Sequence, residues 1–235
     1  MGADGAASAV AKHFSIGTFG RHALTYKAVF NTRIADTRDV DLFFDRKTMP
    51  GFFGWMCPNS KDRLEVGLGI SSNSGNSRAA FNRFMHNDIV KQAIGSGVQL
   101  SGEASIIPLS TRKALVDEKH GVILVGDAAG QVKASTGGGI IFGGNAAIIA
   151  ADAIKAHIER GESLRVYESE YRKRFSFDAL VHRAVRNLYS GTNPASLAYV
   201  LKAMKFMHID KFLGKYGEMD LPSLMLGNVL SKRGA

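Results

Sequence analysis

An acidic side chain follows a short apolar run near the middle of the chain. Asp127 stands between Gly126 and Gly130 in the sequence GDAAG, directly after residues 122–125 (VILV). The four apolar residues are too few for a helix, and we predict a buried, parallel strand there. A carboxylate at the carboxyl end of such a strand borders the crevice where α/β sheets bind ligands, and it can accept hydrogen bonds from sugar-like hydroxyls.

Three consecutive glycines then precede an alanine-rich segment. Gly137, Gly138 and Gly139 lead to Ile140, and residues 146–158 are predicted to form a helix. Glycine has no Cβ, so a flat ring can approach the backbone, and the free N–H groups of a helix start favour negative charge. The combination suits a reduced flavin, whose anion would meet the helix start while Asp127 holds the ribityl chain. Either motif alone is better explained as a turn, and only their order favours the flavin.

The strands that accompany these motifs can be predicted from the alternation of apolar and polar residues. It occurs over residues 24–30, 40–44 and 64–70. Several such strands in succession predict an antiparallel sheet with one buried face.

The helices can be predicted from three- and four-residue spacing. Residues 78–94 have this spacing, with Asn76 or Ser77 as the cap, and predict one helix that packs on the sheet. Beyond residue 163 the spacing is helical to the end, interrupted at Pro194 and Pro222.

The two glycine motifs resemble a known flavoprotein signature. Residues 125–130 (VGDAAG), 136–140 (TGGGI) and 150–151 (AA) are similar to the second flavin signature of the geranylgeranyl reductase family, in the wider group that includes p-hydroxybenzoate hydroxylase. Residues 2–10 resemble that group's GADG-x-x-S-x-V motif, a turn near the FAD pyrophosphate. The resemblance implies that FAD is the cofactor. It implies these cofactor-binding residues: Asp4, Gly5, Gly126, Asp127, Gly130, Gly137, Gly138, Gly139 and Ile140.

A third segment narrows the resemblance to the reductases. Residues 50–58 (PGFFGWMCP) are similar to the P-x-x-Y-x-W-x-F-P stretch that lines the isoprenoid cavity in geranylgeranyl reductases. Phe52, Phe53 and Trp55 are therefore the implied substrate-binding residues. Phe53 and Cys57 replace the usual Tyr and Phe, which leaves the exact prenyl substrate open. Without the resemblance, an ordinary core strand with aromatic residues is the simpler explanation.

The resemblance implies an α/β (α+β) fold in three regions. Residues 1–19 and 116–160 would form an incomplete FAD-binding layer, residues 20–115 an antiparallel substrate-binding sheet with a helix, and residues 161–235 a helical tail. The tail includes residues 217–222 (GEMDLP), which are similar to the family's closing segment. The family's G-x-G-x-x-G turn does not occur here. We therefore expect the chain to correspond to the C-terminal portion of the reductase, with a separate chain that carries the N-terminal dinucleotide-binding unit as a candidate partner.

The implied reaction is hydrogenation of double bonds in geranylgeranyl or other isoprenoid chains, as in membrane-lipid precursors. FAD would supply the hydride, and the electron donor stays open between NAD(P)H and ferredoxin. No residue stands out as the proton donor, so the catalytic residues are unknown. Two alternatives remain: a flavin-dependent aromatic monooxygenase of the same group, and a non-catalytic subunit that binds lipid or a partner chain.

Composition excludes several other classes of protein. Of 235 residues, 45% are apolar and 22% charged, as in ordinary globular proteins. No apolar stretch reaches the roughly 18 residues that a membrane-spanning helix needs. Cys57 is the single cysteine, which excludes an internal disulfide and favours a reducing cytoplasm. The seven histidines form no H-x-H or H-E-x-x-H pair, so we expect no metal site.

The formal charge of +9 favours phosphates, nucleic acid or an anionic membrane surface as partners. We expect no nucleic acid, because no basic run with interleaved aromatic residues and no zinc-finger spacing is present. Four lysines of the tail accompany apolar residues at helical spacing: Lys202, Lys205, Lys211 and Lys215. They suit a helix that lies on a membrane surface, although a solvated face of a core-covering helix explains them more simply.

Overall fold

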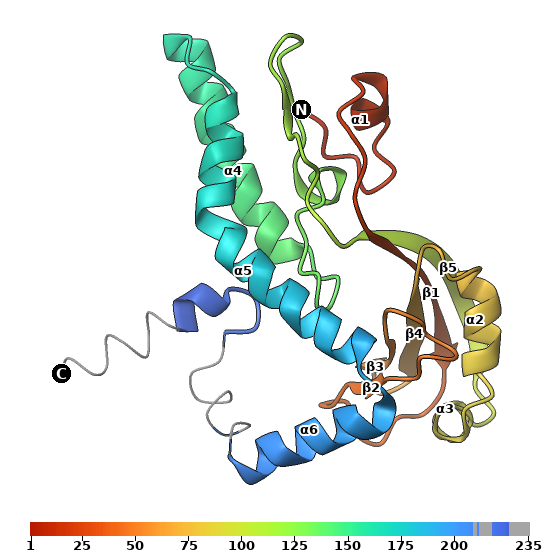
Figure 1. Cartoon of the computed structure of the whole chain (residues 1–235). Coiled ribbons are helices and arrows are strands. Elements are labelled where there is room, and N and C mark those ends of the chain that lie inside the picture. Colours follow the sequence, from red (N-terminus) through yellow and green to blue (C-terminus); the bar gives the residue numbers. More distant parts are fainter. Residues whose placement is uncertain (209–210, 212–217, 226–235) are drawn as a thin grey trace. The chain divides into compact units, whose positions relative to one another are not determined.

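The structure, a computed structural model, describes residues 1–208, 211 and 218–225 (Figure 1). Contacts between residues divide the chain into two units. Unit 1 comprises Met1–Gly20, Pro108–Leu188 and Ala195–Ala235, and unit 2 comprises Arg21–Ile107 and Tyr189–Pro194. By contacts, the first part of the expected helical tail, residues 161–188, groups with the segments expected to bind FAD.

Unit 2 is built on a five-stranded sheet in the order β2-β3-β4-β1-β5. Its strands are β1 (His22–Asn31), β2 (Asp41–Phe43), β3 (Gly54–Ser60), β4 (Arg63–Ser71) and β5 (Val98–Pro108). The pairs β1–β4, β2–β3 and β3–β4 are antiparallel, so that Leu24 lies opposite Ile70. The predicted antiparallel sheet is therefore confirmed. Alternation did not predict β5, because nine of its eleven residues are exposed and neither face differs from the other.

The region predicted as one helix forms two. They are α2 (Ser77–Phe84) and α3 (Asp88–Ile94). Asn76 caps α2 as predicted, with its Oδ1 accepting a hydrogen bond from the N–H of Ala79 at 3.0 Å. Asn87 caps α3 in the same way and has extended backbone angles, φ −64° and ψ 131°. The break follows from Asn87, because a cap residue leaves the helical conformation to bond the next turn.

The side chains of β4 separate the two faces of the sheet. Its even-numbered residues are buried with α2 and α3 in the core of unit 2, which includes Leu64, Val66, Leu68, Ile70, Phe81, Phe84, Val90 and Ile94. The odd-numbered residues Glu65, Gly67 and Gly69 point to the opposite face, as the two-residue period of a strand requires. That face carries no side chain at two successive positions of β4.

Unit 1 combines short strands with long helices. Its elements are α1 (Ala9–His13), β6 (Val116–Asp117), β7 (Val122–Ile123), the 3-10 turn η1 (Gly126–Ala129), α4 (Ile140–Arg160), α5 (Arg165–Gly191) as far as Leu188, and α6 (Pro194–Phe206) from Ala195 onward. Its core joins the β7 region to the inner faces of α4 and α5 through residues such as Leu124, Phe142, Ile149, Tyr167 and Phe175.

The strand predicted at residues 122–125 is present, but its pairing differs from the prediction. β7 pairs antiparallel with β6. The parallel partner is reduced to one bridge between Gly2 and Leu124, in which the N–H of Gly2 donates to Ile123 O at 2.8 Å and the N–H of Val125 donates to Gly2 O at 2.9 Å. The reversal between β6 and β7 occurs at Gly121, whose φ of +64° suits a tight turn.

The tail is described in part. Lys202 and Lys205 lie on α6 and are exposed, whereas Lys215 and Gly217 are outside the described residues. Among the residues that are described, no helix has the length and apolar character needed to span a membrane.

Candidate cofactor site and aromatic face

Asp127 is part of η1, and its side chain lies beside the start of α4. An added Cβ at Gly139, the N-cap of α4, would lie 2.9 Å from Asp127 Oδ1, so the carboxylate is next to the helix N-terminus. Burial raises the pKa of this half-buried carboxyl, and no hydrogen bond or charge within the described chain offsets the rise. The two motifs that the sequence suggested separately are thus adjacent in space, around one carboxylate that lacks a donor.

The ends of η1 are held by a buried hydrogen-bond chain that the sequence did not indicate. Gly126 N–H donates to Gln131 Oε1 at 2.7 Å, and Gln131 Nε2 donates to the hydroxyl of Tyr167, also at 2.7 Å. Tyr167 in turn donates to Leu124 O at 2.8 Å. Burial raises the pKa of Tyr167 to about 12, so the hydroxyl stays protonated and can donate. This series of hydrogen bonds fixes the backbone on both sides of Asp127.

Gly130 is required by its surroundings. Its φ is +73°, and an added Cβ would overlap the carbonyl oxygen of Ser110 and lie 3.0 Å from the ring of Phe19. Gly126 and Gly5 also have positive φ, +67° and +81°, but nothing lies within 4 Å of an added Cβ at either position. These two glycines therefore leave open space beside the backbone, whereas Gly130 allows close packing.

The three consecutive glycines differ in what they do. Gly137 has a φ of +79° and donates its N–H to Lys133 O at 2.7 Å, and Gly138 O accepts from the N–H of Lys133 at 2.9 Å. An added Cβ at Gly138 would lie 2.8 Å from Lys133 Cε. Gly139 makes room for Asp127, and Ile140, which follows, is 89% exposed.

Asp4 and Gly5 form a turn between the Gly2 bridge and α1. Ser8 Oγ donates to Asp4 Oδ1 at 2.6 Å, which lowers the pKa of Asp4, and the N–H of Val10 donates to Oδ2 at 3.2 Å. Because the bridge between Gly2 and Leu124 is parallel, the two segments of the backbone continue past it in the same direction. The turn at Asp4 and the turn at residues 126–130 therefore leave the same edge of unit 1.

Arg112 is a buried cation that the sequence did not single out. Its Nε donates to Ala128 O at 2.6 Å, and its Nη1 donates to Gly17 O and to Ile16 O. Its guanidinium carbon lies 4.1 Å from the centre of the Phe19 ring. Burial lowers the pKa of Arg112, and the charge of Asp4 acts in the opposite direction. The side chain joins the loop before β1 to η1.

The three candidate substrate residues lie together on the face of unit 2 that is free of α2 and α3. Added Cβ atoms at Gly67 and Gly69 would overlap the rings of Trp55 and Phe52, respectively, so both rings pack flat on the β4 backbone. Phe53 stacks on Phe52, with centroids 4.5 Å apart and planes 15° apart. Phe52 and Phe53 are buried, and Trp55 is half-buried. We call Phe52, Phe53 and Trp55 the aromatic face.

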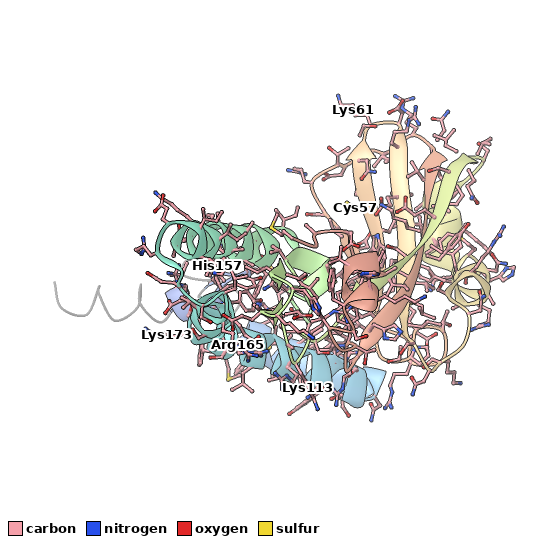
Figure 2. All side chains as sticks on the ribbon, turned by 90° about the horizontal axis from the view of Figure 1, so that it is seen from above. Cys57, Lys61, Lys113, His157, Arg165 and Lys173 are labelled. Atoms are coloured by element: carbon pink, nitrogen blue, oxygen red, sulfur yellow. The ribbon has the colours of Figure 1, made fainter. Side chains whose placement is uncertain are left out.

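Trp55 is oriented by a charged pair beside it. Its Nε1 donates to Glu65 Oε1 at 2.9 Å, and Lys27 Nζ lies 3.3 Å from Glu65 Oε2. Figure 2 shows Cys57 further along β3 and Lys61 at the tip of the β3–β4 hairpin. Burial and then the charge of Glu65 raise the pKa of the Cys57 thiol, which favours its protonated, less nucleophilic form.

Comparison with known proteins gives relatives that are named as reductases of geranylgeranyl compounds. No protein-family model matches the chain. The chloroplastic geranylgeranyl diphosphate reductase of Arabidopsis thaliana is 30% identical over 217 residues, which are 85% of this chain and 44% of that protein. A digeranylgeranylglycerophospholipid reductase of Methanocaldococcus jannaschii is 24% identical over 180 residues, which are 74% of this chain and 45% of that protein. The chain is a homologue of the geranylgeranyl reductases. The resemblance inferred from the motifs is confirmed.

Several solved structures with a fold similar to that of this chain are flavin-dependent proteins. A geranylgeranyl bacteriochlorophyll reductase-like protein from Thermoplasma acidophilum has a TM-score of 0.67 at 21% identity, over 75% of this chain and 45% of that one. A flavin-dependent brominase also has a TM-score of 0.67, at 15% identity, over 98% of this chain and 62% of that one. The predicted fold class, a mixed α/β chain with an antiparallel sheet, is confirmed.

The chain spans about half the length of the curated proteins that it matches. The share is between 44% and 57% for four of them. Within the described part of the chain, His, Cys, Asp and Glu nowhere gather in groups of three that could hold a metal ion.

Proposed function

We propose that this chain supplies the flavin-facing loop and the isoprenoid-facing sheet of an FAD-dependent reductase that hydrogenates double bonds of geranylgeranyl chains. The observation that carries the proposal is the position of Asp127 beside the N-terminus of α4, in a homologue of geranylgeranyl reductases. Its half-buried carboxylate has no hydrogen-bond donor among the described residues. The substrates of the archaeal relatives, by their names, favour membrane-lipid precursors.

The residues present fit FAD. Asp127 would accept a hydrogen bond from a ribityl hydroxyl, which supplies the donor that it lacks. The N-cap Gly139 has no side chain to accept hydrogen bonds from the first N–H groups of α4, and these groups would face the electron-rich end of the ring. Gly5 and Gly126 leave open space beside the two turns that meet at one edge of unit 1. When bound, FAD would supply the hydride for the double bond.

The aromatic face would contact the apolar substrate. Trp55 is the accessible member, and its ring is held flat by Gly67 and by the bond to Glu65. An apolar ring in a fixed orientation suits a flexible isoprenoid. Because the ring is already ordered before the substrate binds, binding costs it no further conformational entropy. The electron donor, NAD(P)H or ferredoxin, and the proton donor stay open.

We further infer that a polypeptide with the G-x-G-x-x-G unit completes the cofactor site by covering the outer face of α4. That face has a hollow of about 480 Å³, lined by Met1, Ala147, Ala151, Ile154, Lys155, Ile158 and Glu159. Ile148 and Ile158 are 63% and 76% exposed. The relatives are longer than the part that matches this chain, and a segment from that additional length would cover this apolar surface. Its burial would contribute about 25 cal/mol of stability per Å².

The test is to measure flavin binding with and without such a polypeptide. We expect the 235-residue chain alone to be colourless and inactive, and the complemented protein to be yellow and to reduce a geranylgeranyl substrate. In the complemented protein, Asp127→Ala should weaken FAD binding about 10- to 150-fold, since a hydrogen bond to a charged group is worth about 1.5–3 kcal/mol.

Asp88→Ala is the matched control, because Asp88 is an exposed carboxylate on α3, in unit 2. Equal FAD affinity in the Asp127 and Asp88 variants would remove Asp127 from the site. If complementation restores neither colour nor activity, the alternative of a non-catalytic lipid-binding subunit is favoured. Stoichiometric FAD in the chain alone would show that no further polypeptide is needed.

A further inference from the structure

The segment that resembles the family's closing sequence contacts the glycine loop of the candidate cofactor site. Asp220 forms an ion pair with Lys133 Nζ, in which the lysine and aspartate side chains are only 14% and 33% exposed. The backbone oxygen of Asp220 lies 3.0 Å from Nε2 of His182 on α5. A single residue of the tail thus binds both the loop that precedes α4 and the helix behind it.

Two further contacts anchor the same segment. Ser223 donates its N–H to Asp178 Oδ1 at 2.7 Å and its hydroxyl to Oδ2 at 2.9 Å. Asp178 is fully buried on α5, so these two bonds stabilise a charge that water does not reach. Leu221, between Asp220 and Ser223, packs against the core of unit 1. Figure 1 shows residues 218–225 beside α5.

His182 connects this segment to the loop from the other side. Its Nδ1 lies 2.8 Å from Ser135 Oγ, and both side chains are buried. A carbonyl oxygen can only accept, so Nε2 donates to Asp220 O, and in the neutral ring Nδ1 accepts from the Ser135 hydroxyl. The imidazole therefore bridges the loop and the tail segment with both of its nitrogens.

Lys133 transmits these contacts to the glycines. Its backbone N–H and carbonyl are bonded to Gly138 and Gly137, and its side-chain stem passes over Gly138, where an added Cβ would lie 2.8 Å from Cε. The ion pair with Asp220 fixes the end of that stem. The orientation of the loop is consequently coupled to a segment more than 80 residues later in the chain.

We propose that residues 218–225 are a strap that holds the glycine loop, residues 133–139, in the conformation that the cofactor needs, with Asp220 and His182 as positioning residues. The cofactor part of this inference rests on the proposed function. The strap itself does not, because the contacts that define it lie within the described chain.

The test compares Asp220→Asn and Lys133→Met with the double variant and with Glu118→Gln. Both single changes remove the ion pair and keep similar side-chain volume. Glu118→Gln is the matched control, because it removes the exposed ion pair with Arg165, 3.0 Å long, in the same unit. Hydrogen exchange of the Gly137 amide, which is bonded to Lys133 O, is measured in the full chain, and FAD affinity is measured in the complemented protein.

We expect Gly137 exchange to become about tenfold faster or more in each single variant, no faster again in the double variant, and unchanged in the control. FAD affinity should fall in both single variants, fall no further in the double variant, and stay unchanged in the control. Unchanged exchange in both single variants would overturn the strap. Faster exchange with unchanged FAD affinity would overturn its positioning role. If the wild-type protein binds no FAD at all, the proposed function fails, and the exchange measurement still decides the strap.

Discussion

Replacement of Gly130 by alanine should destabilise unit 1 far more than the same replacement at Gly161. Both residues have left-handed backbones, with φ of +73° and +67°. That conformation costs an L-residue about 1–2 kcal/mol, which is the whole effect expected at Gly161, where nothing lies within 4 Å of an added Cβ. At Gly130 the new methyl group would also overlap Ser110 O.

The overlap at Gly130 cannot be relieved by a side-chain rotation, because the obstacle is backbone. The N–H of Arg112 donates to Ala129 O at 2.9 Å, which ties the two chain segments together. Overpacking of this kind costs about 1–3 kcal/mol in addition, so that the total loss at Gly130 is about 2–5 kcal/mol.

Urea unfolding followed by circular dichroism at the helical band measures the difference. With a slope of about 2 kcal/mol per molar urea, the midpoint for Gly130→Ala should lie about 0.5–1.5 M below that for Gly161→Ala. Gly144→Ala, in the exposed interior of α4 with no atom within 4 Å, should instead raise the midpoint slightly. An equal loss in the Gly130 and Gly161 variants would refute the argument from the Ser110 carbonyl.

Three other expectations follow from the contacts described above. Burial raises the pKa of Asp127, so the ionised form weakens the fold, and Asp127→Asn should raise the melting temperature at pH 7. The gain should shrink as the pH falls through the raised pKa and vanish below 3.8, the ordinary pKa of an aspartate, and a gain that stays constant with pH would contradict the argument. Gly67→Ala should displace the ring of Trp55, cost about 1–3 kcal/mol, and shift the emission of this single tryptophan to the red, whereas an unshifted spectrum would show that the ring does not pack there. Because its pKa is raised, the thiol of Cys57 should react with iodoacetamide more slowly than the thiol of glutathione at pH 8, and an equal or faster rate would contradict the raised pKa.

The sequence by itself determined the features that depend on local periodicity or on one residue's conformation. Alternation over residues 24–30 and 64–70 predicted β1 and β4, because each strand buries one side of its pleat. Asn76 or Ser77 was predicted as a cap because such side chains can bond a backbone N–H of the first helical turn, and Asn76 is the one that does so. The family resemblance was also a local property, since the glycine motifs are needed wherever a backbone approaches a ring or a helix start closely.

Only the tertiary structure decided which distant residues are buried together. Gln131, Tyr167 and Arg112 are ordinary polar residues in the sequence. They become parts of the candidate site because folding removes them from water and places them against each other and against backbone N–H and C=O groups. The same holds for Asp220 and Lys133, which are 87 positions apart. β5 was missed for the complementary reason: a strand exposed on both faces has no periodic burial for its sequence to encode, and its position beside β1 alone makes it a strand.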